Sequence, residues 1–423
     1  MNLLKFNSQI VDITPSFPTK LFRMKGSKRH KDVYSNLESN LIHLISEDFE
    51  MFVFSIDLLF ITSELYAFIK SELQKYFDLN DENILTIASH THFSPSIERD
   101  REGMGDFDEK YFEFLKVRLA AQILGITRAQ NSFVELEVVE MKSEKLTTNR
   151  RRKVRTLRNY CHEFIAMEPN LKGYKNETFK IIRFNDYKSK KTVSVLWSFP
   201  CHPSNFYDSS RITSEYPGAI RDFIRSVMEK VDISVVFIPG FMGDVRAAPP
   251  RRSRISRWIR NLVQLSYPVN QYKFISKNEY ESWVSEVVLN FELTWKKQDS
   301  ITLSGSKLKS KIIHRPLTDL GISVKNIENL SLRIVQIGEC FKIYTISAEV
   351  TSEYIRFFDK FVDENEFYIA SGYSDMVYGY LPTNSQIKEG GYECEGHFNS
   401  FLISGKYKND TQNTIEKWIM EMK

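Results

Sequence analysis

The sequence has few cysteines and no arrangement of them that suggests a disulfide framework. The four thiols are scattered among 423 residues without Cys-x-x-Cys spacing, at Cys161, Cys201, Cys340 and Cys394. This pattern argues against a structural zinc site or a redox motif and favours reduced thiols in a cytoplasmic protein. No apolar segment of the kind that forms a secretory signal follows the first residues, so we expect a cytoplasmic location.

Long hydrophobic runs and a strong charge of one sign are also missing. The longest apolar stretch, residues 51–61, is interrupted by Asp57 and is too short to cross a bilayer. The formal net charge is only +4, and no zinc finger or helix-turn-helix pattern is present, so we expect no nucleic-acid partner. With 42% hydrophobic residues, the chain can bury a large core.

The apolar periodicity predicts an α/β protein with a mixed β-sheet core flanked by helices. Residues 41–46 and 51–56 are typical of a hairpin, and a helix over 62–77 followed by a strand over 84–87 completes a βαβ unit. We expect further helices at 106–124, 220–228, 278–295 and 411–422. We expect further strands at 8–13, 133–140, 179–184, 192–198, 234–239, 332–337 and 341–346.

No internal repeat or flexible linker divides the sequence. We therefore expect a single catalytic domain over residues 1–423, with residues 245–310 as a candidate insertion over the active site. The basic run at 149–153 is, taken alone, typical of a solvated loop.

Three metal-competent positions follow predicted strands. His90 and His92 come after the strand at 84–87, His202 follows the strand at 193–197, and Glu349 follows the strand at 341–346. Alone, a His-x-His pair is most often part of a surface loop. However, residues i and i+2 of a strand share a face, and open α/β sheets bind ligands at the carboxyl ends of their strands. Two histidines and one carboxylate form a common catalytic zinc set, so we predict a zinc site at these strand ends.

Several motifs, in order along nearly the whole chain, resemble the catalytic domain of the neutral, non-lysosomal ceramidases. The most specific is a pair of tyrosines, Tyr380 and Tyr392, twelve residues apart. The other matching motifs are Asp12-Ile13-Thr14-Pro15, Asp57-Leu58-Leu59, Ser89-His90-Thr91-His92, Asn149-Arg150, Gly243-Asp244-Val245 and Ala348-Glu349-Val350-Thr351.

The resemblance implies a zinc-dependent hydrolase of amide bonds. It implies that Zn²⁺ is bound by four residues, His90, His202, Glu349 and Tyr380. It also implies a catalytic group in which His92 moves protons and the other two members donate hydrogen bonds to the reacting carbonyl: His92, Arg150 and Tyr392.

The sequence departs from the family in ways that concern the substrate. Arg246 stands where the family has a serine directly after Gly-Asp-Val, and neither a C-terminal β-sandwich domain nor a secretory signal is expected. A guanidinium cannot replace a hydroxyl nucleophile, but it binds carboxylate or phosphate well. We therefore expect a deacylase for a soluble, anionic N-acylated or N-acetylated small molecule of the sugar type, with Arg246 as a substrate-binding residue.

Two other functions stay open at this point. The first is a ceramidase-like lipid amidase at the inner membrane surface, where the basic cluster Arg246–Arg260 would make peripheral contact with anionic headgroups. The second is a catalytically dead, metal-containing binding protein, since the family's serine is absent.

Overall fold

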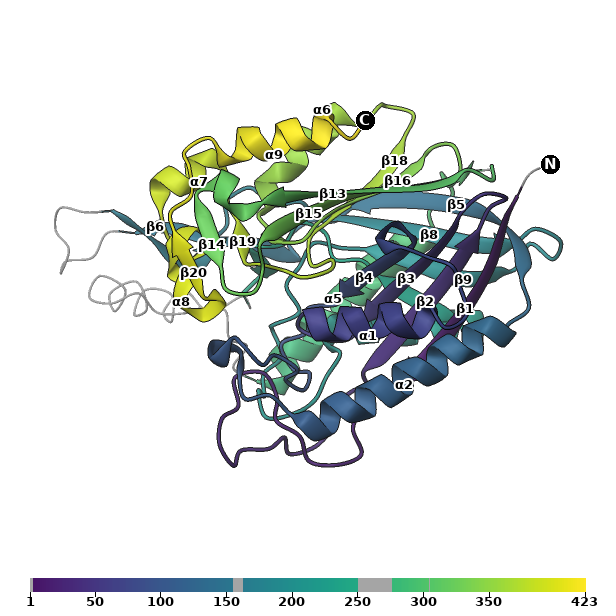
Figure 1. The fold of residues 1–423 in the computed structure, drawn as a ribbon, viewed down its shortest axis with the longest axis horizontal. Coiled ribbons are helices and arrows are strands. Elements are labelled where there is room, and N and C mark those ends of the chain that lie inside the picture. Colours follow the sequence, from purple (N-terminus) through teal and green to yellow (C-terminus); the bar gives the residue numbers. More distant parts are fainter. Residues whose placement is uncertain (1–2, 155–162, 250–275, 304) are drawn as a thin grey trace.

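The computed structural model describes residues 3–154, 163–249, 276–303 and 305–423 (Figure 1). Its largest element is a nine-stranded sheet in the order β10-β9-β8-β5-β1-β2-β3-β4, with β12 paired to β5. Within the described part of this sheet, the β3/β4 and β9/β10 pairs are parallel and the other pairs are antiparallel. The strands are β1 (Leu4–Asp12), β2 (Glu38–Ile45), β3 (Glu50–Ile56), β4 (Ile84–Ala88), β5 (Ser132–Lys142), β8 (Thr178–Asp186), β9 (Thr192–Ser198), β10 (Ser234–Phe237) and β12 (Ile301–Leu303).

A second sheet of four strands lies against the first, in the order β13-β15-β16-β18. Its strands are β13 (Leu308–Pro316), β15 (Asn329–Ile337), β16 (Phe341–Ile346) and β18 (Phe367–Ser371). One hydrophobic core contains apolar residues from both sheets, among them Phe6, Val53, Leu85, Val335 and Ile343. The two sheets therefore pack face to face.

Helices cover the outer faces of both sheets, which gives four layers (Figure 1). Helices α1 (Ser63–Leu73) and α2 (Glu109–Arg128) pack on one part of the large sheet, and α3 (Glu215–Met228) and α5 (Lys277–Trp295) on another. Helices α6 (Ile355–Phe361) and α9 (Thr411–Met420) cover the second sheet. The described residues also form short helical elements: η1 (Asp81–Asn83), η2 (Glu102–Met104), η4 (Leu317–Leu320), η5 (Ser352–Tyr354), α7 (Asn384–Glu389), η6 (Tyr392–Gly396) and α8 (Phe398–Phe401).

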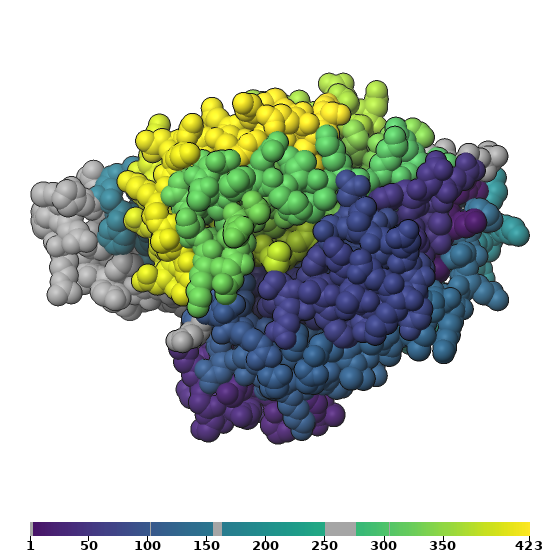
Figure 2. Space-filling view, viewed as in Figure 1, coloured from purple at the N-terminus to yellow at the C-terminus, as the bar shows by residue number. Residues whose placement is uncertain are grey.

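Three small sheets connect the main layers near one end. They are β11 (Val245–Ala247) with β6 (Thr147–Val154) and β7 (Phe164–Asn170), β14 (Ile322–Val324) with β20 (Ile403–Gly405), and β17 (Glu349–Val350) with β19 (Tyr380–Leu381). In the space-filling view the C-terminal residues, green to yellow, form one side of the visible face, and the N-terminal residues, purple to blue, form the other (Figure 2).

The α/β prediction with a mixed sheet core and flanking helices is confirmed. The βαβ unit is present: β3 and β4 are parallel and α1 connects them. Helix α1 begins where its sequence allows, because the Thr62 side chain caps the Leu65 amide, and its buried face is Leu65, Ile69 and Leu73. The predicted hairpin is the antiparallel pair β2/β3.

The solvated loop predicted at 149–153 is wrong, because those residues belong to β6. Arg150 and Arg151 are 4% and 5% exposed, and the buried carboxylate of Glu393 lies between them, 2.7 Å from Arg150 Nε and 2.7 Å from Arg151 Nη1. A charge run can therefore enter the interior when a distant residue supplies the opposite charge.

Cys201, Cys340 and Cys394 are free thiols, and Cys161 lies outside the described residues. Most of the candidate insertion at 245–310 also lies outside them, since residues 250–275 are not described. In the described part of the chain, no helix combines the length and the apolar character needed to cross a membrane.

Candidate metal centre

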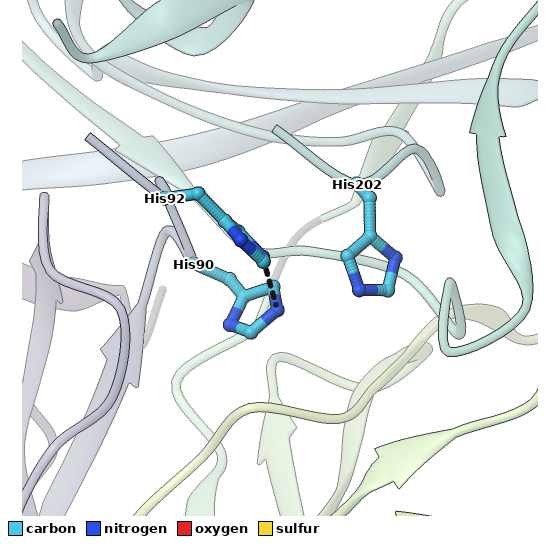
Figure 3. Close-up of side chains that lie close together, drawn as sticks. All are labelled: His90, His92 and His202. Atoms are coloured by element: carbon cyan, nitrogen blue, oxygen red, sulfur yellow. Dashed lines mark hydrogen bonds between the residues drawn. The ribbon is translucent and has the colours of Figure 1, made fainter. Parts of the chain in front are cut away.

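The three metal-competent side chains predicted from strand ends lie together, although they come from two different sheets. His90 follows β4 and His202 follows β9, both in the large sheet, whereas Glu349 follows β16 of the second sheet. Nitrogen atoms of His90, His92 and His202 lie within 4.8 Å of one another (Figure 3). The site therefore forms where the carboxyl ends of β4 and β9 in the large sheet and of β16 in the second sheet meet.

His90 reaches the site through a turn. Strand β4 ends at Ala88, and His90 has a left-handed backbone with φ +64°, so alternation along a strand does not place the two histidines. The His90 amide donates to Leu58 O (2.9 Å) and its Nδ1–H donates to Leu59 O (2.9 Å). The Nε2 atoms of His90 and His92 are 3.3 Å apart (Figure 3).

His202 is held in the same manner by the turn that follows β10. Its Nδ1–H donates to Met242 O at 2.6 Å, and its amide donates to Val245 O at 3.2 Å. Gly243 in this turn lies against β17: its amide donates to Val350 O (2.8 Å), and a Cβ there would be 2.6 Å from Glu349 O. The Gly243-Asp244-Val245 motif thus brings the His202 loop and Glu349 together.

Glu349 places one carboxylate oxygen between the two imidazoles. Its Oε2 is 3.3 Å from His90 Nε2 and 3.2 Å from His202 Nε2. Each imidazole already donates its Nδ1–H to a backbone carbonyl, so its Nε2 is the ring nitrogen that faces the carboxylate. Three buried electron-pair donors that face one another could hold a metal ion, and histidines oriented by carbonyls together with a carboxylate are a common metal-binding donor set.

Burial and charge act on these groups in opposite directions. Burial lowers the pKa of His202 from 6.5 to about 3, which keeps the ring neutral. Burial alone would raise the pKa of Glu349, but His90 and His202 hold it well below its usual range. His92 is only half-buried, and desolvation followed by repulsion from His90 lowers its pKa well below 6.5. Its ring packs edge-on against Phe22, with the centroids 5.0 Å apart.

The two motif tyrosines lie beside this trio, next to Arg150. Tyr380 on β19 pairs in register with Glu349 on β17. The Tyr380 and Tyr392 ring centroids are 5.4 Å apart, and the Arg150 guanidinium carbon lies 5.2 Å and 5.5 Å from them. Glu393 fixes Arg150 from behind, through Nε at 2.7 Å.

Asp244 connects the elements that carry these groups. Its buried carboxylate accepts from the Ser352 amide (2.7 Å), Asn149 Nδ2 (2.8 Å) and Gln386 Nε2 (3.2 Å). Its backbone oxygen accepts from the Arg150 amide at 2.8 Å. The aspartate of the Gly-Asp-Val motif therefore links β6, η5 and α7 behind the site.

Arg246 lies on β11 and extends to the loop after His202. Its Nη2 donates to Ser204 O at 2.6 Å. Its positive charge also opposes the effect of burial on Glu215, whose pKa desolvation raises from 4.5 to about 7. The other arginines of the predicted basic cluster, Arg251, Arg252, Arg254, Arg257 and Arg260, lie outside the described residues.

Sequence reasoning missed three side chains at the site. Tyr373, just after β18, donates from its hydroxyl to Glu349 Oε2 (3.4 Å), and its ring centroid is 4.4 Å from that of His90. Glu393 holds the two buried arginines, and His397 lies under both motif tyrosines. Tyr373 follows the pattern of a polar residue beyond a strand, so a prediction of β18 would have found it. Glu393 and His397 have no such local signal.

Comparisons with known proteins identify the fold. The sequence matches no protein-family model and no curated protein. In structure, the chain is similar to the neutral ceramidase from Pseudomonas aeruginosa, with a TM-score of 0.74 and 13% identity over 100% of this chain and 74% of that one. It is also similar to a ceramidase complexed with C2, with a TM-score of 0.70 and 14% identity over 99% of this chain and 74% of that one. The chain therefore has the fold of the neutral ceramidases, as the resemblance of its motifs predicts.

Proposed function

We propose that this protein is a zinc-dependent amidohydrolase that cleaves an N-acyl bond. The observation that carries the proposal is the set of facing donors, His90 Nε2, His202 Nε2 and Glu349 Oε2, at 3.2–3.3 Å. His90, His202, Glu349 and Tyr380 would hold the metal. A zinc ion in such a site lowers the pKa of a water molecule towards about 7 and polarises a carbonyl oxygen.

The remaining residues have complementary roles in amide hydrolysis. His92 is neutral, half-buried and next to the donor set, so it can take a proton from the attacking water and return it to the leaving nitrogen. Arg150 and Tyr392 are placed to donate hydrogen bonds to the carbonyl oxygen as negative charge develops on it, an effect worth roughly 3 kcal/mol per donor. Glu393 keeps the Arg150 guanidinium in place for that contact.

A cavity beside the histidines supports a short acyl group. Its apolar walls include Phe22, Leu59, Phe60 and Met104. The ring centroid of Phe22 lies 5.0 Å from that of His92, and the ring centroid of Phe60 lies 5.0 Å from that of His90. Leu59 O accepts a hydrogen bond from His90. These apolar walls next to the candidate metal ligands suit an acetyl or similarly short acyl chain.

The amine side of the substrate is the other half of the proposal. Arg246 offers a cationic group at the loop after His202. We propose that it selects a soluble N-acylated compound with an anionic group, such as an acidic amino sugar derivative.

Metal content and turnover, measured together, test this function. His202→Ala and Glu349→Ala should abolish both bound zinc and the release of amine from N-acyl substrates, since each removes one donor of the trio. His43→Ala is the matched control, because His43 is a buried histidine that pairs with Glu50 on the large sheet. Full turnover by a metal-free preparation would refute the proposal.

The ceramidase structures favour a second candidate, a lipid amidase. The two candidates differ in chain length and location of the substrate. A series of N-acyl substrates from acetyl to palmitoyl, with and without anionic liposomes, separates them. The lipid amidase would prefer long chains and would sediment with liposomes in a salt-sensitive manner.

A further inference from the structure

His397 is buried beneath the two motif tyrosines and contacts both of them. It ends η6 and precedes α8, and its ring centroid lies 4.9 Å from that of Tyr380 and 6.1 Å from that of Tyr392. Building on the proposed function, we infer that His397 is a positioning residue that sets the Tyr380–Tyr392 pair relative to Glu349. It acts through hydrogen bonds to the backbone of the two tyrosines.

The contact with Tyr380 uses its backbone amide, which does not bond to β17. Strand β19 pairs with β17 through neighbouring residues, because Glu349 N donates to Gly379 O (2.8 Å) and Thr351 N donates to Leu381 O (3.2 Å). The Tyr380 amide instead donates to His397 Nε2 at 3.3 Å. The imidazole therefore supports Tyr380 from the side opposite Glu349.

The Tyr392 contact fixes the start of an unusual helical turn. His397 donates to Tyr392 O twice, from Nδ1–H at 2.8 Å and from its own amide at 3.1 Å. The turn, η6, is a π-helix, a rare geometry that is frequent at functional sites. The imidazole bonds the last residue of this turn to its first, and so fixes the backbone from which the Tyr392 side chain projects.

Only one form of the ring makes both contacts. The Tyr380 amide needs a lone pair on Nε2, and Tyr392 O needs a proton on Nδ1, so the ring must be the neutral Nδ1–H tautomer. Gly379 supplies the space for this arrangement, because a Cβ there would lie 3.1 Å from His397 Nε2. One rigid imidazole thus joins two tyrosines from different elements, and the position of one depends on the other.

Three substitutions separate these contacts. His397→Phe removes both side-chain hydrogen bonds at similar size. His397→Asn keeps a donor near the Nδ1 position, and His397→Gln keeps an acceptor near the Nε2 position. His43→Phe serves as the control, because it makes the same change at another buried histidine, one that stacks on Phe52.

Kinetics and a crystal structure of each variant are the readouts. His397→Phe should lower kcat on the order of 10²-fold with KM nearly unchanged, because small displacements of catalytic groups cost about that much. In the His397→Phe structure the hydroxyls of Tyr380 and Tyr392 should move from their parental positions. His397→Asn should restore the position of Tyr392, and His397→Gln should restore the position of Tyr380. His43→Phe should leave kcat and both tyrosines unchanged.

The structure of the variants keeps this inference distinct from the proposed function. If no N-acyl compound is turned over by the parent, the proposed function fails, and the tyrosine positions alone decide the role of His397. If Tyr380 and Tyr392 keep their parental positions in His397→Phe, the inference is overturned. If the Phe variant does not fold, the Asn and Gln structures decide it in the same way.

Discussion

Replacement of Asp244 by alanine should cost far more stability than an aspartate replacement usually does. The carboxylate is fully buried and accepts from the Ser352 amide, Asn149 Nδ2 and Gln386 Nε2. Alanine would leave these donors without that acceptor inside the protein, and each buried unsatisfied donor costs about 1–3 kcal/mol. Relaxation and water entry recover part of the sum, so we expect a loss of about 3–5 kcal/mol in the free energy of unfolding.

Urea denaturation of Asp244→Ala, with bound metal measured in the same samples, is the assay. The midpoint should fall at an unchanged slope, and metal should be lost, because Asp244 links β6 to the segment after Glu349. Asp244→Asn should also be destabilising, but less than Asp244→Ala, because an amide nitrogen at either carboxylate position faces an N–H donor from which it cannot accept.

Asp186→Ala is the matched control for this prediction. Its carboxylate also accepts short hydrogen bonds, from Ser189 N and Ser189 Oγ at 2.7 Å each, but at an exposed turn. We expect that substitution to cost less than about 1 kcal/mol. Equal losses for the two alanine variants would refute the reasoning from burial.

Two further perturbations have defined outcomes. Burial raises the pKa of Glu215 from 4.5 to about 7, so the folded state retains a proton that the unfolded state releases, and stability should fall as the pH rises through this window, by at most about 1.4 kcal/mol per pH unit. Glu215→Gln should remove that part of the slope in denaturation measured at several pH values, and an identical slope in parent and variant would contradict it. Gly243→Ala places a Cβ 2.6 Å from Glu349 O, so it should displace β17, reduce bound metal and cost roughly 1–3 kcal/mol in thermal unfolding; a variant with parental metal content would show that the backbone can yield there.

Local patterns account for what the sequence predicts well. The short apolar runs of β2 and β3 and the capped, amphipathic α1 are properties of adjacent residues, so the hairpin and the βαβ unit follow from them. The position of polar residues after β4, β9 and β16 identifies His90, His202 and Glu349 as candidates, and the structure brings them together. Their roles, and those of Tyr380, Arg150 and Tyr392, stay predictions that metal and activity measurements must test.

Non-local chemistry accounts for what the sequence does not predict. Arg150 and Arg151 enter the interior because Glu393, 243 and 242 residues away, neutralises them. No window of neighbouring residues contains that information. The second sheet is similar: without β18, Tyr373 has no reason to be singled out, and His397 becomes meaningful only once Tyr380 and Tyr392 are seen on either side of it.

The meeting of two sheets at the donor trio has a consequence for biosynthesis. His202 and Glu349 are separated by 147 residues, and Tyr380 lies further on. Contacts between residues so distant in the sequence form slowly, because the chain must lose the entropy of closing a large loop before the contacts stabilise it. A ribosome-bound chain that has already folded β4 and β9 would expose two histidines without their carboxylate. We therefore expect metal uptake to be among the last events of maturation, after the second sheet has docked.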